Sequence, residues 1–240
     1  LETKSMAHDW RMKKILVLGG TGFVGAHVCE KLIREDFTVT LATRRRSNAN
    51  HLIHLPGLTV LEINVHDEAA LTQAAAGHDG VVNLVAILHG TQADFEKTHV
   101  ALPKKLAHAC VSAGIKQVVH VSALGANALQ PESAPSMYLR SKGEGEAVLN
   151  QAALGAGAGA AAQAGFDLSI LRPSVMFGEG DKFINLFAKL QQVLPFMPLA
   201  GAAARFQPVW VQDVATAVVR CLKGASAQAS PRVIEVAGPD

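Results

Sequence analysis

The sequence predicts an α/β fold in which helices cover both faces of a parallel sheet. Six short apolar runs are expected to form strands: 15–18, 37–42, 58–65, 81–86, 118–122 and 168–171. Stretches with apolar residues at helical spacing separate several of these runs, and strands that alternate with helices are typical of a parallel sheet. Continuously apolar runs such as ILVL and VVNLVA suit strands that are buried on both faces. Together these observations predict a doubly wound, Rossmann-type core, whose ligands bind at the carboxyl ends of the strands.

The connecting helices carry recognisable start and stop signals. Helices are expected over 23–35, over 67–76 with Asp67 as N-cap, and over 138–154. Another helix follows the run at 81–86; it has Pro103 in its first turn, where a missing N–H costs little, and ends near Gly114.

We expect two parts in the chain. The dinucleotide-binding core would span 12–178, and a small C-terminal substrate lobe, interleaved with the last sheet elements, would span 179–240. In that lobe Trp210 is expected to pack in the interior, and Asp213 to cap a helix over 214–222. Because the sequence stops directly after a strand-like run, the natural protein is expected to continue.

Composition excludes several classes of function. The chain of 240 residues has 22 Lys+Arg against 20 Asp+Glu, and this balance gives no basic surface for nucleic acid. No apolar run approaches the length of a membrane span. The cysteines Cys29, Cys110 and Cys221 form no CxxC pair, so a reducing, cytoplasmic location is expected. The histidines show no metal-site spacing beyond His51 and His54, and we expect no metal.

A glycine-rich loop lies between the first strand and the first helix. Gly19, Gly22 and Gly25 have the spacing of a dinucleotide-binding turn. The first permits the tight turn, the second lets a pyrophosphate approach the backbone, and the third allows the helix to pack closely on the strand. The helix N-terminus adds free N–H groups and a partial positive charge.

Arginines follow the second strand, where folds that bind NAD usually place an acidic residue. Thr43 stands at that position, and Arg44 and Arg45 come next. A guanidinium suits a phosphate through its charge and its forked donors. We therefore expect NADP(H) rather than NAD(H), with Arg44 the first candidate for the 2′-phosphate and Arg45 the second.

A tyrosine and a lysine one helical turn apart are candidate catalytic residues. Tyr138 and Lys142 share one face of their helix through i,i+4 spacing. A nearby ammonium favours the phenolate, so we expect Lys142 to lower the pKa of Tyr138 and to improve it as an acid–base group. Lys142 is also expected to hold the nicotinamide ribose. Ser122, at the end of the fifth strand, is placed to hydrogen-bond a substrate carbonyl.

These motifs resemble those of the extended and atypical short-chain dehydrogenases/reductases, the NAD-dependent epimerase/dehydratase group. The resemblance covers roughly residues 13–238. Within the superfamily the chain is most similar to bacterial relatives of the NADPH-binding accessory subunit of respiratory complex I. The segments that carry this likeness include VHVSALGA after the fifth strand, YLRSK, RPSVMFG with DKFIN, and FQPVWVQDVA.

The resemblance implies roles for individual residues. The pyrophosphate would lie along Gly19, Thr21, Gly22, Phe23, Val24 and Gly25. Asn64 and Val65 would border the adenine, Ala86 would lie near the inner ribose, and Pro173 to Val175 would contact the nicotinamide. Active members have a second hydroxyl residue after Ser122, where this chain has Ala123.

Three functions follow from this pattern. The first is an enzyme, either an NADP(H)-dependent oxidoreductase or an epimerase/dehydratase that modifies a sugar nucleotide. In the oxidoreductase, the Tyr/Lys pair would serve hydride transfer with a small or apolar carbonyl or alcohol substrate. The second is a non-catalytic, cofactor-binding accessory subunit, which the resemblance and Ala123 favour. The third is a redox sensor that reads the NADP(H) ratio. A homodimer or a larger assembly is expected by analogy.

Overall fold

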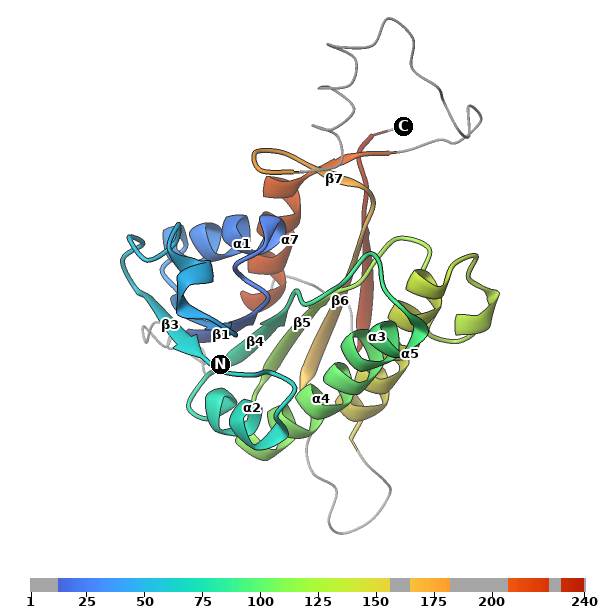
Figure 1. Ribbon diagram of the computed structural model, residues 1–240, viewed down its shortest axis with the longest axis horizontal. Coiled ribbons are helices and arrows are strands. Elements are labelled where there is room, and N and C mark those ends of the chain that lie inside the picture. Colours follow the sequence, from blue (N-terminus) through green and yellow to red (C-terminus); the bar gives the residue numbers. More distant parts are fainter. Residues whose placement is uncertain (1–12, 156–164, 182–206, 225–229, 240) are drawn as a thin grey trace, which may run out of the picture.

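The computed structural model describes residues 13–155, 165–181, 207–224 and 230–239. A seven-stranded parallel sheet crosses the middle of the molecule, with helices on both faces (Figure 1). The strand order β3-β2-β1-β4-β5-β6-β9 reverses direction between β1 and β4. This is a Rossmann-type sheet, as the sequence predicts, and its crevice opens where the strand order reverses.

The strands correspond to the apolar runs, with small differences at their ends. The first four are β1 (Lys14–Leu18), β2 (Thr38–Thr43), β3 (Leu58–Glu62) and β4 (Gly80–Asn83). The next two are β5 (Gln117–Val121) and β6 (Asp167–Pro173). The third and fourth strands are shorter than expected, because the chain turns away from the sheet after Glu62 and after Asn83. These turns place residues 64–67 and 84–90 in loops at the carboxyl edge.

Alternate residues of the strands pack into two separate hydrophobic cores, one on each face of the sheet. Ile15 and Val17 face helices α1 (Phe23–Arg34) and α7 (Val211–Leu222), whereas Leu16 and Leu18 face the opposite layer. That layer contains α2 (Glu68–Ala75), α4 (Leu102–Ala113) and α5 (Met137–Ala153). Figure 1 shows the two helical layers on either side of the sheet. Burial on both faces explains the continuous apolar runs of the inner strands.

Several local predictions are confirmed. Asp67 caps α2 by accepting a hydrogen bond from the backbone N–H of Ala70, and Gly114 ends α4 in the left-handed conformation, with φ 67°. Pro103 lies in the first turn of α4. The chain is already helical before that turn, through α3 (Gln92–Phe95) and a π-helix (Glu96–Ala101).

The C-terminal part differs from two expectations. Trp210 is 50% exposed and is not an interior residue. The last helix begins at Val211, with Trp210 at the N-cap, so Asp213 lies in the first turn and does not cap it. Its early start follows from the preceding strand β8 (Val209–Trp210), which pairs with β7 (Met176–Phe177) and leads directly into the helix.

Parts of the expected C-terminal lobe belong to the central sheet layers. Helix α7 packs against α1, and β9 (Arg232–Val236) pairs in parallel with β6. Residues 182–206 of the expected lobe lie outside the described residues, so the lobe remains a prediction. Among the described helices none is both long enough and apolar enough to cross a membrane.

Candidate active site

A large cleft lies at the carboxyl ends of the central strands. Its volume is about 1580 Å³, more than the ~300–1000 Å³ typical of a small-ligand pocket. Loops after β1, β4, β5 and β6 and the first turn of α5 provide most of its wall. Nine expected site residues line it: Thr21, Gly22, Phe23, Ala86, Ser122, Tyr138, Pro173, Ser174 and Val175. The cleft therefore joins the expected cofactor loop to the expected catalytic groups.

The three glycines of the loop lie in different surroundings. Gly19 has φ +79°, and a Cβ there would lie 2.9 Å from the backbone carbon of Leu84. A Cβ on Gly25 would lie 2.4 Å from the carbonyl oxygen of Gly19, so close helix–strand packing demands this glycine. A Cβ on Gly22 would meet only the Gly19 oxygen, at 3.6 Å, an ordinary contact. The protein itself leaves room at Gly22, which fits a residue kept small for a ligand.

The N-terminus of α1 is available to an anion. Gly22 is the N-cap and provides no side-chain cap, and the first turn carries no acidic residue. The first N–H groups of a helix have no partner within it, so Phe23 and Val24 present donors beside the loop. This end of the cleft fits a pyrophosphate.

The arginines after β2 divide into two kinds. Arg46 is committed to β3, since its side chain donates to the carbonyl of Val60 at 3.3 Å and its backbone N–H donates to Glu62 at 2.7 Å. Arg44 and Arg45 are exposed, and their side chains make no hydrogen bond within the part of the chain described here. Both guanidinium groups are free for an anion at the carboxyl end of β2.

Positive charge also gathers beside the β3 loop. Burial lowers the pKa of His66, and the charges of Lys97, Lys105 and Arg44 lower it further. Lys105 donates to the carbonyl of His66 at 2.6 Å. The charge of Arg44 therefore acts on His66, which directly follows Asn64 and Val65, the residues that the resemblance assigns to the adenine.

The expected adenine residues differ in their surroundings. Asn64 is exposed, and its side chain accepts a hydrogen bond from the backbone N–H of His66 at 3.1 Å. Val65 is buried with α2 in the second core cluster. Neither lines the large cleft, and nor do Gly19, Val24, Gly25, Arg44, Arg45 or Lys142.

Tyr138 and Ser122 both line the cleft. The Ser122 hydroxyl is buried and has no hydrogen-bond partner among the described residues. Buried polar atoms are normally paired, so this hydroxyl suits a ligand group. The ring of Tyr138 packs edge-on against His99, with centroids 5.5 Å apart. Burial raises the pKa of Tyr138, so the expected lowering by Lys142 is not found.

Lys142 lies behind the cleft and is fully buried. Its ammonium donates to the carbonyl of Val121 at 2.8 Å. Burial lowers the pKa of Lys142 to about 8, and the carboxylate of Glu146 opposes that shift. The i,i+4 spacing places Lys142 one turn below Tyr138, but the described cleft wall does not include it.

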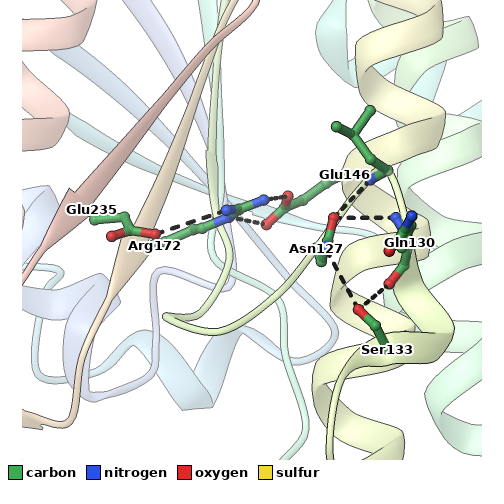
Figure 2. A network of polar contacts seen from close by, with 7 residues as sticks. Asn127, Gln130, Ser133, Glu146, Arg172 and Glu235 are labelled. Carbon is green, nitrogen blue, oxygen red and sulfur yellow. Dashed lines mark hydrogen bonds and ion pairs between the residues drawn. The ribbon is translucent and has the colours of Figure 1, made fainter.

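A buried ion pair supports this part of α5. Arg172, from β6, donates to both oxygens of Glu146, at 3.1 Å and 2.6 Å, and lies 3.9 Å from Glu235 (Figure 2). Figure 2 also shows Asn127, whose side chain organises the loop before α5 by accepting from two backbone N–H groups. The ion pair fixes α5 to β6, and the turn fixes the loop that leads from Ser122 to Tyr138.

Other cleft residues were not expected as site residues. They come from loops whose path depends on the fold: Leu88, Ala123, Leu124, Ser136, Leu139, Met176, Gly180, Asp181, Gln207 and Pro239. Most are apolar or small, and Asp181 is the only charged residue among the cleft-lining residues that the structure describes. The likeness over DKFIN and the rule that ligands bind at the carboxyl ends of the strands indicate this region, but they do not identify these individual side chains. No group of three metal-ligating side chains occurs in the described ranges.

Comparison with known proteins identifies the family. Residues 15–237 match the model of the NAD dependent epimerase/dehydratase family. The chain belongs to this family. One similar solved structure is a double mutant of the dTDP-glucose 4,6-dehydratase DesIV from Streptomyces venezuelae with NAD and DAU bound. The match covers 94% of this chain with TM-score 0.76 and 24% identity. The match spans 76% of the DesIV chain and shows the same fold.

Several curated relatives are named as subunits of mitochondrial NADH dehydrogenase (ubiquinone). The mitochondrial NADH dehydrogenase (ubiquinone) 1 alpha subcomplex subunit 9 of Arabidopsis thaliana is 29% identical over 232 residues, covering 93% of this chain and 53% of that protein. The Rattus norvegicus subunit is 32% identical over 218 residues, covering 88% and 53%. The chain spans about half the length of these relatives.

Proposed function

We propose that the chain binds NADP(H) in the cleft, with the pyrophosphate on the glycine loop and the 2′-phosphate at Arg44. The observation that carries this proposal is that the protein would accept a Cβ at Gly22, which lies beside the uncapped start of α1. The preference for NADP(H) rests on Arg44, which is exposed, affects the pKa of His66 and forms no ion pair among the described residues.

Hydride transfer is the activity that the opposite end of the cleft supports best. NADPH, when bound, supplies the hydride. The buried Ser122 hydroxyl would hydrogen-bond a carbonyl oxygen of the substrate, and the Tyr138 phenol would donate its proton to that oxygen. Burial raises the pKa of Tyr138, so the phenol is protonated at neutral pH, the form that a proton donor needs for reduction of a carbonyl to an alcohol. The apolar wall suits a small or apolar substrate.

A non-catalytic accessory subunit is the second candidate. The relatives named above are themselves subunits of a larger enzyme. In this chain Lys142 is bonded to the Val121 carbonyl and lies outside the cleft wall, so it contacts neither the proton-transfer groups nor the nicotinamide ribose, whereas the glycine loop is unaffected. Loss of NADPH absorbance with small apolar ketones, abolished by Tyr138→Phe, would decide for the enzyme.

A titration with NADPH and NADH tests the cofactor proposal. Arg44→Ala is expected to weaken NADPH binding about tenfold and to leave NADH binding unchanged, because a hydrogen bond to a charged group contributes roughly 1.5–3 kcal/mol. Arg46→Ala is the matched control, since Arg46 belongs to the same turn but is bonded to Val60. Equal affinity of the wild-type chain for the two nucleotides would refute the preference.

A further inference from the structure

His99 links the two walls of the cleft to each other. It lies in the π-helix Glu96–Ala101 and is 2% exposed. Its Nε2 accepts a hydrogen bond from the backbone N–H of Ile87 at 3.1 Å, and its Nδ1 lies 2.8 Å from the hydroxyl oxygen of Ser141. One imidazole thus contacts the loop after β4 and the helix that carries Tyr138.

The hydrogen bonds determine which ring nitrogen of His99 carries the proton. The Ile87 N–H can only donate, so Nε2 must be the unprotonated acceptor. Nδ1 then carries the hydrogen and donates to Ser141, whose own hydroxyl donates to the Tyr138 carbonyl at 2.9 Å. Burial, with a smaller effect of Lys142, lowers the pKa of His99 to about 3, so the ring stays neutral and keeps this pattern.

Both ends of this chain of hydrogen bonds reach the cleft. Ile87 lies between Ala86 and Leu88, which line the wall after β4. Ser141 is bonded to the backbone of Tyr138, and the ring of His99 packs on the ring of Tyr138. His99 lies in the π-helix and is buried, and such one-turn irregularities within helices are frequent at functional sites.

We propose that His99 is a positioning residue, which holds the Ala86–Leu88 wall against the cofactor and fixes Tyr138 through Ser141. The inference rests on the proposed function for the ligand, NADPH, but the effect on Tyr138 can be measured without any ligand. Tyr138 is the only tyrosine in the chain, so the absorbance of the ionised phenol reports on this residue alone.

Four variants separate the two contacts of His99. His99→Phe keeps an aromatic ring and loses both hydrogen bonds, whereas His99→Gln retains an acceptor that can reach the Ile87 N–H. Ser141→Ala removes only the link to Tyr138. His78→Gln is the control, because His78 bonds to Thr40 within the fold and does not line the cleft.

NADPH titration and tyrosine titration should give different patterns. His99→Phe is expected to weaken NADPH binding about fivefold, the effect of one neutral hydrogen bond, whereas His99→Gln, Ser141→Ala and His78→Gln bind as the wild type does. Burial raises the pKa of Tyr138, so loss of its support should open the phenol to water and lower its titration midpoint in His99→Phe, His99→Gln and Ser141→Ala, but not in His78→Gln.

Two results would overturn the proposal. One is wild-type behaviour of His99→Phe in both titrations, which would mean that ring packing suffices. The other is an equal response of His78→Gln, which would reveal general destabilisation. If the wild-type chain does not bind NADPH, the proposed function fails, and the Tyr138 midpoints of the same proteins still decide the role of His99.

Discussion

The two ends of the cleft are prepared in opposite ways. At the dinucleotide end, the protein would accept a Cβ at Gly22, and α1 begins without a side-chain cap. The Arg44 side chain makes no hydrogen bond among the described residues. At the reaction end, Lys142 is bonded to a backbone carbonyl and Tyr138 is held by His99 and Ser141. Ser122 is the exception there, with a buried, unpaired hydroxyl.

This difference separates binding from chemistry. Donors without a partner can bind an anion with little rearrangement, so the dinucleotide end is ready to bind. A proton-transfer group works best with a pKa near the working pH, and burial moves Tyr138 away from it. The fold therefore supports cofactor binding directly, and turnover depends on what the substrate brings to Ser122 and Tyr138.

The largest expected effect comes from the ion pair under the reaction end. Arg172→Met leaves the fully buried Glu146 carboxylate without its partner and should lower the free energy of unfolding by about 3–5 kcal/mol. Lys223→Met breaks the exposed pair with Glu35 and should have no measurable effect. Urea unfolding of both variants checks this. Similar losses in both would show that burial of the pair does not matter.

The glycine loop gives the next effect, and it divides stability from binding. Gly25→Ala forces a Cβ into the Gly19 carbonyl and should destabilise the fold by roughly 1–3 kcal/mol. Gly22→Ala fits the protein and should keep the melting temperature but lose NADPH binding. Thermal unfolding and nucleotide titration of both variants test this. A stable Gly22→Ala variant that binds NADPH normally would contradict the assignment of the pyrophosphate.

The sequence predicted the dinucleotide end better than the reaction end. Glycine spacing and the Asp67 cap are local signals, because each depends on a few neighbouring residues. The position of the Lys142 ammonium depends on its hydrogen bond to Val121 in β5. His99 lies in a π-helix, which no local sequence pattern predicts. The exposed Trp210 was likewise beyond prediction, because the early start of α7 follows from β8 pairing with β7.

Acid should destabilise the protein through its buried histidines. Burial lowers the pKa of His99 to about 3 and that of His120 well below its usual value. Between about pH 6.5 and 3 the unfolded chain binds protons that the folded chain excludes, so stability falls as the pH falls, by about 1.4 kcal/mol per pH unit for each such group.

His99→Phe removes one of these groups, so its stability should fall less steeply than that of the wild type over the same range. Urea unfolding at several pH values between 6.5 and 5 measures the two slopes. Parallel slopes would mean that His99 takes up a proton in the folded protein.

NADPH titration of a Ser122→Ala, Tyr138→Phe double variant tests the separation of binding from chemistry most directly. The variant removes the two polar groups that are proposed to contact the substrate, and it leaves the glycine loop and Arg44 intact. We expect its affinity for NADPH to lie within about twofold of the wild-type value, since less than one neutral hydrogen bond, ~0.5–1.5 kcal/mol, would be lost. A loss of tenfold or more would contradict the account, because the reaction end would then hold the cofactor.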